Sequence, residues 1–263
     1  MFEIITKIFK SEGIENVGIL PIEECEIINE RIFPQDVKSA ILFSIPYRSV
    51  KNYSEDGFSE YARIYDYHKF SKELYDRIIG YMKNETGYEF FGFCDHSPIN
   101  EKLAIAKCGF GVIGRNSLFI DNKYGSFVFI GSLLTNMSCN KNAAKISPCI
   151  NCKKCIEACP NNAIQEIGID RTKCLSNISQ KKNKSDEEKA LLKKHNIVWG
   201  CDICQKVCPY NENAEISPIE KFKHTRIERI DKEYVDSLND EEFNKFAFSY
   251  KGRKIVNDNI EFK

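Results

Sequence analysis

Apolar residues in the first half of the chain follow two different spacings. Nearly continuous apolar runs at 39–47 and 127–134 predict strands, the second of them buried. Within residues 61–87 the apolar side chains recur every three or four positions, which predicts one long helix with Gly87 as its C-cap. A short apolar run at 90–95 predicts a further strand that ends in a turn.

Glycine-containing turns divide the stretch that follows. Residues 99–109 have the pattern of a helix, and residues 111–120 join a glycine turn to a strand. Residues 124–135 predict the next strand, and the turn sequence DNKYG predicts that these two strands form a hairpin. The fold class predicted for residues 1–140 is therefore α+β or α/β.

The second half of the chain has a different character. Residues 141–215 are rich in cysteine, and we interpret them as a separate module. Residues 216–263 are highly charged and are predicted to form a mostly helical tail, in which residues 233–248 have the pattern of one amphipathic helix. The predicted organisation is a domain at 1–140, followed by this module and this tail.

Composition narrows the classes of function. Of 263 residues, 42% are hydrophobic, which is enough for a packed core. Lys plus Arg and Asp plus Glu number 38 each, so a nucleic-acid partner would need a local basic patch. No apolar run approaches the roughly 20 residues that span a bilayer, and the first residues lack the features of an export signal. We therefore expect a cytoplasmic protein with no membrane partner.

Twelve cysteines in a chain expected to be cytoplasmic favour metal binding over disulfides. One run, CINCKKCIEACP, has the spacing of bacterial ferredoxins that hold two 4Fe–4S clusters. Its cysteines are Cys149, Cys152, Cys155 and Cys159. A second run, CDICQKVCP, supplies Cys201, Cys204 and Cys208. We expect the other four, Cys25, Cys94, Cys108 and Cys139, to be ordinary buried thiols.

The spacing also predicts how these cysteines share two clusters. Three thiolates of the first run can wrap one cube while its fourth points to another, and the ligand missing from the second run must come from Cys174, the only cysteine between the runs. The predicted ligands of the first cluster are Cys149, Cys152, Cys155 and Cys208. Those of the second are Cys159, Cys174, Cys201 and Cys204. A pair of structural zinc ions is the alternative, since C-x2-C pairs also bind zinc.

The first 140 residues contain one carboxylate whose position invites two interpretations. Asp95 ends an apolar strand just before a proline turn. It is either a general acid with a raised pKa or an ordinary turn-capping aspartate. The string GFGVIG at 109–114 follows a helix and precedes a strand, the reverse of the order that a dinucleotide site needs. These residues alone leave the reaction open.

Six segments, in order, resemble the cobalamin-dependent epoxyqueuosine reductases, which carry two 4Fe–4S clusters. Together they cover most of residues 40–215. The segments are YARIYDYHK (61–69), CDHSPINEKLAIAKCGFGVIGRNSLFI (94–120), YGSFVFIGSLLTN (124–136), CINCKKCIEACPNNAI (149–164), DRTKCLSNIS (170–179) and WGCDICQKVCPYN (199–211).

The resemblance implies a reaction and its cofactors. Members of that family remove the epoxide oxygen of epoxyqueuosine in a tRNA anticodon, giving queuosine. The resemblance implies cobalamin in a first domain like that of flavin nitroreductases, with electrons passing from an external low-potential donor through both clusters. It also implies that Asp95 protonates the departing oxygen, because an epoxide oxygen leaves poorly as an alkoxide. Cobalamin would then carry the difficult step and the protein would supply position.

A cobalamin pocket is implied at three places: the helix carrying Arg63, the loop at 114–117 and the segment after Cys174. The candidate contacts are Arg63, Asp95, Gly114, Arg115, Asn116, Ser117, Ser176, Asn177, Asp202 and Gln205. For each of them a loop cap or a surface polar residue is the alternative interpretation. His68 lies in the matching helical motif, and His96 stands beside Asp95.

Longer members of the family continue into helical repeats that help to hold tRNA, whereas this sequence ends at Lys263. Two basic groups are candidate phosphate contacts, with a solvated charged face as the alternative. They are Lys181, Lys182, Lys184, Lys193 and Lys194, and Lys221, Lys223, His224, Arg226 and Arg229. Competing functions are a corrinoid reductase of a small molecule, as in reductive dehalogenases, and a ferredoxin-type electron carrier. We expect the protein to act as a monomer.

Overall fold

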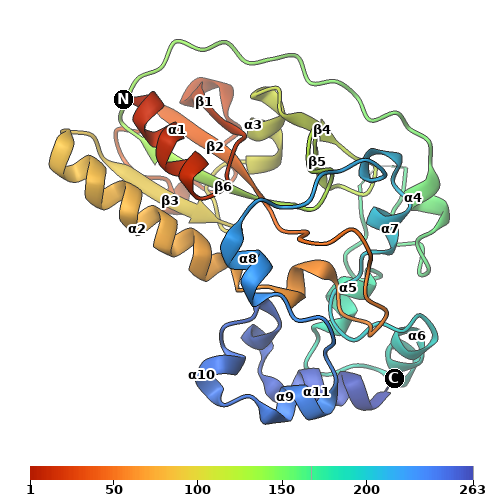
Figure 1. Cartoon of the computed structure of the whole chain (residues 1–263). Coiled ribbons are helices and arrows are strands. Elements are labelled where there is room, and N and C mark those ends of the chain that lie inside the picture. Colours follow the sequence, from red (N-terminus) through yellow and green to blue (C-terminus); the bar gives the residue numbers. More distant parts are fainter. Residues whose placement is uncertain (167, 263) are drawn as a thin grey trace.

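The first part of the chain is built on one antiparallel sheet. In the computed structural model, which describes residues 1–166 and 168–262, four strands lie in the order β1-β2-β6-β3 (Figure 1). Every pairing in this sheet is antiparallel, so of the two predicted classes the α+β arrangement is the one observed. The strands are β1 (Val17–Pro21), β2 (Ser39–Pro46), β3 (Phe90–Cys94) and β6 (Val128–Thr135).

Helices cover both faces of this sheet because β2 is apolar on both. Ile41 and Phe43 pack in the core that also contains residues of the first two helices. Ala40 and Leu42 point the other way and pack with the third helix. The α-helices concerned are α1 (Phe2–Ser11), α2 (Tyr67–Glu85) and α3 (Glu101–Lys107).

The long helix predicted at 61–87 is shorter than expected. Residues 60–63 form a separate 3-10 turn, and α2 begins only at Tyr67. The reason is local, because the Asp66 side chain accepts a hydrogen bond from the backbone N–H of His68 and so caps the helix there. The C-cap is Thr86 rather than Gly87.

The predicted hairpin between 111–120 and 124–135 is wrong. The strands β4 (Gly111–Ile113) and β5 (Phe119–Asp121) pair with each other in a small second sheet. β6 instead lies between β2 and β3. Only an isolated bridge between Asp121 and Gly125 remains at the predicted turn. Five of the eight residues of β6 are buried, and at the centre of a sheet the backbone N–H and C=O groups of both strand edges find hydrogen-bond partners.

Short helices follow, joined by irregular chain. Residues 136–153, which link β6 to the first of them, contain no helix or strand. A capping box formed by Ser185 and Glu188 starts the longest helix of this group. The helices are α4 (Lys154–Glu157), α5 (Leu175–Ser179), α6 (Asp186–Lys194) and α7 (Ile203–Lys206).

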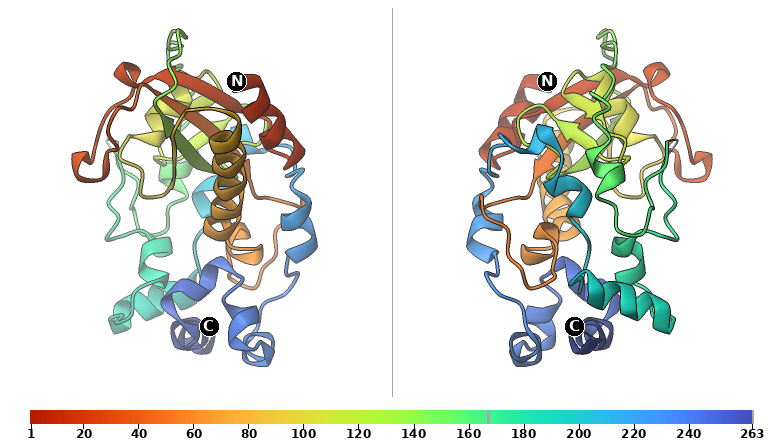
Figure 2. Two further views of the ribbon diagram at one scale, coloured as in Figure 1. Left: turned by 90° about the vertical axis from the view of Figure 1, so that its left-hand side faces the viewer. Right: turned by 90° about the vertical axis from the view of Figure 1, so that its right-hand side faces the viewer.

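The tail folds back onto this cysteine-rich part and builds a second core. Trp199 is fully buried there with Phe248 and Val256. Of the four tail helices among the described residues, the last three gather on the side of the molecule away from the sheet (Figure 2), whereas the first packs its Phe222 into the core that contains Ile41 and Phe43 of β2. The tail helices are α8 (Glu220–Thr225), α9 (Lys232–Ser237), α10 (Asp240–Phe243) and α11 (Arg253–Phe262). The 3-10 turns of the chain are η1 (Ile22–Glu24), η2 (Glu30–Ile32), η3 (Glu60–Arg63), η4 (Pro209–Asn211) and η5 (Ala247–Lys251).

The single amphipathic helix predicted at 233–248 is interrupted. α9 ends at Ser237, Leu238 is extended, and Asn239 opens a new capping box with Glu242. An asparagine that satisfies the free N–H groups of a new helix ends the previous one because the cap residue needs non-helical backbone angles. In the part of the chain that the structure describes, no helix is long and apolar enough to cross a membrane.

Candidate active site and cysteine module

Asp95 follows β3 in a turn that sends its carboxylate toward the start of α2. Its φ is +67°, in the left-handed region that aspartate tolerates better than most residues. The Tyr67 hydroxyl donates a hydrogen bond to Asp95 Oδ2. His68 Nε2 lies 3.0 Å from the same oxygen. Two neighbouring residues of one helix therefore hold one carboxylate oxygen.

His68 sits between two carboxylates. Its Nδ1 is 2.9 Å from Oδ1 of Asp66, the oxygen that also caps α2, and its Nε2 faces Asp95. These hydrogen bonds, first to Asp66 and then to Asp95, outweigh burial and raise the pKa of His68 to about 9. With this pKa the imidazole is protonated at neutral pH. Since the side chain is 48% exposed, it can exchange protons with water.

The raised pKa that the general-acid interpretation gave Asp95 does not agree with its surroundings, and the catalytic role of Asp95 stays a prediction. Burial does act to raise the pKa of this carboxyl, but the hydrogen bonds from His68 and Tyr67 outweigh it, and the pKa is lowered. Burial, with the charge of Asp95 next, raises the pKa of Tyr67 well above its usual range. At neutral pH the protons of this group therefore reside on the imidazole and the phenol.

These side chains line a cavity of about 680 Å³. The ring of Tyr67 stacks on Phe129 with 3.6 Å between centroids, which fixes the floor of the cavity. The lining residues are Tyr61, Asp66, Tyr67, His68, Asp95, His96, Phe129, Ser176, Gln180, Ala247 and Tyr250. The cavity thus joins the first domain, α5 and the tail.

A second cavity of about 380 Å³ shares Asp95 and Phe129 with the first. It contains Glu101, whose carboxylate accepts a 2.7 Å hydrogen bond from the Ser132 hydroxyl. Burial raises the pKa of Glu101 to about 8. Sequence reasoning missed this acid because the first residue of a helix is an ordinary place for an exposed glutamate. It also gave Tyr67 no role, although Tyr67 lies within the matching motif beside His68.

The predicted cobalamin contacts fall in different places. Ser176 lines the larger cavity and Ser117 the smaller one, both with Asp95. Asn177 is exposed on α5, and Arg63 is fully buried, where its guanidinium pairs with Asp56. Neither Asn177 nor Arg63 lines these two cavities.

Two other predicted contacts, Gln205 and Asp202, are buried and line neither of these cavities. The Gln205 amide donates to Asp202 Oδ1 at 2.9 Å, and its oxygen accepts from Ser126 at 2.8 Å. Asp202 accepts a 2.7 Å hydrogen bond from the backbone N–H of Glu60, which ties the cysteine module to the turn before α2. Gly114, Arg115 and Asn116 lie elsewhere, around a hollow formed by cysteines.

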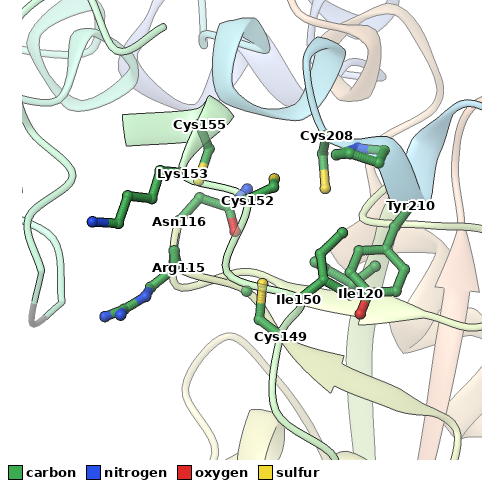
Figure 3. Close-up of a pocket in the computed structure, with 12 residues that line it drawn as sticks. Arg115, Asn116, Ile120, Cys149, Ile150, Cys152, Lys153, Cys155, Cys208 and Tyr210 are labelled. Carbon is green, nitrogen blue, oxygen red and sulfur yellow. The ribbon is translucent and has the colours of Figure 1, made fainter. Parts of the chain in front are cut away.

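Four thiols surround that hollow. Figure 3 shows Cys149, Cys152, Cys155 and Cys208 with their sulfur atoms around a common space. Burial raises the pKa of Cys208, and the nearby Cys149, Cys152 and Cys155 add to the effect. The two cysteine runs are thus brought together here through α4 and α7, which contact each other.

A second group of thiols lies deeper. Burial raises the pKa of Cys201 to about 12, and nearby Cys174 and Cys159 add to it. Cys204 has its pKa raised by burial and then by Cys201. Among the described residues, no three or more His, Cys, Asp or Glu side chains are grouped so as to hold a single metal ion.

The remaining cysteines are partly buried rather than fully buried. Burial raises the pKa of Cys25 to about 11 and that of Cys108 to about 12, so both stay protonated thiols at neutral pH. They pack against the core below the sheet, together with β-strand residues.

Comparison with known proteins agrees with this geometry. A family profile described as a 4Fe-4S double cluster binding domain matches residues 148–211. An epoxyqueuosine reductase from Leadbetterella byssophila is 34% identical over 166 residues, which cover 62% of this chain and 55% of the relative. One from Cyclobacterium marinum is 31% identical over 227 residues, covering 83% of this chain and 72% of the relative.

Solved structures share the fold over the whole chain. The epoxyqueuosine reductase from Streptococcus thermophilus superposes with a TM-score of 0.81 at 23% identity, covering 100% of this chain and 80% of that one. An epoxyqueuosine reductase crystallised with an epoxyqueuosine-modified tRNA stem loop gives a TM-score of 0.80 at 19% identity, covering 99% and 80%. The chain spans about half the length of several curated relatives that it matches. With the shared fold and a relative more than 30% identical over most of its length, the chain belongs to the epoxyqueuosine reductase family.

Proposed function

We propose that this chain reduces epoxyqueuosine in tRNA to queuosine in the cytoplasm, as a monomer. The reaction adds two electrons and two protons, breaks both C–O bonds of the epoxide, and releases its oxygen as water. The observation that carries the proposal is the hydrogen-bonded group of Tyr67, His68 and Asp95 at the wall of a cavity of about 680 Å³.

We assign two 4Fe–4S clusters to the cysteine module with crossed ligands. Cys149, Cys152, Cys155 and Cys208 hold one, and Cys159, Cys174, Cys201 and Cys204 hold the other. Support comes from the mutual electrostatic influence within each group and from the match of residues 148–211 to a double-cluster domain. When bound, such clusters supply one-electron transfer.

Cobalamin fits the two cavities that meet at Asp95. Their combined volume exceeds that of an ordinary ligand pocket, and an aromatic floor with polar walls suits a large ring carrying amide groups. We assign Ser117, Ser176 and Phe129 to hold it, because they line these cavities together with Asp95. When bound, cobalamin supplies a low-valent metal centre for the reductive step.

This chain's own residues manage the protons. His68 donates the proton that passes through Oδ2 of Asp95 to the leaving oxygen, and Tyr67 orients that carboxylate by donating to the same oxygen. Asp66 keeps the imidazole in place and favours its charged form. Because His68 is half exposed, solvent replaces the proton and so provides the second one.

The tRNA is held by the basic end of α6 rather than by α8. In the α8 group most cations already pair with carboxylates, for example Lys221 with Glu73 and Lys223 with Glu220. Among the described residues no carboxylate lies within 4.0 Å of Lys193 or Lys194, so their charge is available to phosphates.

The test is anaerobic reconstitution with iron, sulfide and cobalamin, followed by incubation with epoxyqueuosine-containing tRNA. Nucleoside mass spectrometry would then show loss of one oxygen. Bound corrinoid and iron without any queuosine would instead favour reduction of a small molecule. Protein that binds iron but no corrinoid would favour an electron carrier.

A further inference from the structure

The two groups of cysteines differ in how far they reach the surface. Cys152 is the one exposed cysteine among the described residues, and Ile150 beside it is 58% exposed. In the other group all four cysteines, Cys159, Cys174, Cys201 and Cys204, are partly buried. An electron arriving from outside therefore meets the Cys149–Cys208 group first.

The segment around that group carries positive charge only. Residues 140–156 contain four lysines and no acidic residue. Lys145, Lys153 and Lys154 are exposed, and this segment runs along the outside of the molecule from β6 to α4 (Figure 1). Figure 3 shows Lys153 and Arg115 extending away from the thiols. The nearest carboxylate to Lys153 is Glu166, at 4.0 Å and itself largely exposed, so it neutralises little of this charge.

An apolar centre accompanies the charge. Along the sequence Ile150 and the exposed Pro148 stand between Lys145 and Lys153, so this exposed segment combines apolar and basic residues. Protein partners are recognised by such a combination, in which the rim steers encounter and the centre excludes water. A nucleic acid would make little use of an exposed isoleucine at the middle of the patch.

We propose that Lys145, Pro148, Ile150, Lys153 and Lys154 form the docking surface for a small acidic redox protein. In each encounter the reduced partner loses one electron and the oxidised cluster at Cys149–Cys208 gains it; no atom is transferred. The inference rests on the proposed cluster ligands. Charge complementarity identifies the partner. Among the described residues Lys145 and Lys154 have no carboxylate within 4.0 Å and Lys153 meets only the exposed Glu166, so the surface attracts a protein of the opposite sign.

The position of this surface separates it from the substrate site. None of its five residues lines the cavity at Asp95 or the neighbouring one at Glu101. It is also distinct from the basic end of α6, where we place the tRNA. A donor bound here leaves both sites open, so reduction and substrate binding do not compete.

The test follows reduction of the clusters alone, by stopped-flow absorbance, in protein checked for about eight irons. Reduced flavodoxin, an acidic protein, is the probe. Lys145→Glu/Lys154→Glu should lower the second-order rate about tenfold or more at low salt, and the gap should close as ionic strength rises. Lys72→Glu/Lys83→Glu, two exposed lysines of α2 with the same change in net charge, should leave the rate near that of the wild type. Light-driven reduction by free deazaflavin, which needs no docking, should be equal in all three proteins.

A second variant keeps the proposal testable if Lys145→Glu/Lys154→Glu does not fold. Ile150→Ser keeps the charge and should slow reduction by flavodoxin at every salt concentration, because it removes the apolar centre. Equal flavodoxin rates in wild type and Lys145→Glu/Lys154→Glu would overturn the proposal. So would a loss of tRNA stem-loop affinity in that variant with an unchanged flavodoxin rate, which would make the surface an RNA contact. Cluster reduction needs no epoxyqueuosine, so these outcomes are independent of the proposed reaction.

Discussion

Replacing His68 by glutamine tests where the proton of the reaction comes from. Glutamine keeps a hydrogen-bonding side chain of similar reach but cannot carry the proton. In the wild type the imidazole lies between Asp66 and Asp95, and its pKa is raised to about 9. The charged form is therefore present below pH 9 and is lost as pH rises through that value, so the rate of epoxide reduction should fall above about pH 9.

The magnitude follows from the two protonation states. At pH 7 a group with a pKa of about 9 is about 99% protonated, whereas the Asp95 carboxyl, whose pKa is lowered by its hydrogen bonds, is ionised. Loss of His68 also removes a hydrogen bond that lowers the pKa of Asp95, and burial then raises that pKa. This partial compensation places the expected loss near 100-fold, at the lower end of what general acids contribute.

The assay is single-turnover conversion of epoxyqueuosine at several pH values, read by nucleoside mass spectrometry with pre-reduced protein. His68→Gln should turn over best in acid and decline toward neutral pH, because the remaining acid is Asp95. His224→Gln is the matched control, since that side chain is 79% exposed on α8 and away from the cavity. Turnover of His68→Gln within about threefold of the wild type, with the same pH profile, would refute the assignment.

Three further predictions address the catalytic carboxylate, the clusters and the core. Asp95→Asn should keep the iron content and lose about 100-fold or more in turnover, because the amide cannot relay a proton; wild-type turnover would show that the carboxylate is not in the proton path. Cys174→Ser should lower bound iron by about half, and unchanged iron analysis would contradict the crossed ligands. Gly131→Ala should lower the free energy of unfolding by about 1–3 kcal/mol in urea titration, since the new Cβ would meet Phe43 at 2.4 Å. Gly80→Ala, with nothing within 4 Å on α2, should raise it by about 0.5–1 kcal/mol, and equal effects would count against this packing argument.

Local patterns predicted what depends on local physics. The buried strands at 39–47 and 127–134 were recognisable because their side chains are apolar on both faces, and the observed β2 and β6 agree with them. The cysteine spacing predicted two groups of four because short loops limit which thiolates can reach one cube. Family resemblance then indicated cobalamin and a tRNA substrate, neither of which could be inferred from the spacing of residues in the chain.

Other features depended on contacts between distant residues. DNKYG has the composition of a hairpin turn, yet β6 left β5 to lie between β2 and β3, where both of its edges are paired. Caps at Asp66 and Asn239 broke two helices that periodicity had joined, because a single side-chain hydrogen bond decides where a helix begins.

The sequence by itself determined the cysteine module, the main strands and the presence of Asp95 in a turn. Only the tertiary structure decided the charge state at that turn. Residues 66–68 and Asp95 are more than 25 positions apart, and their hydrogen bonds move the proton from the carboxyl to His68. A pKa is set by the groups within a few ångströms, and which groups those are is known only when the chain is folded.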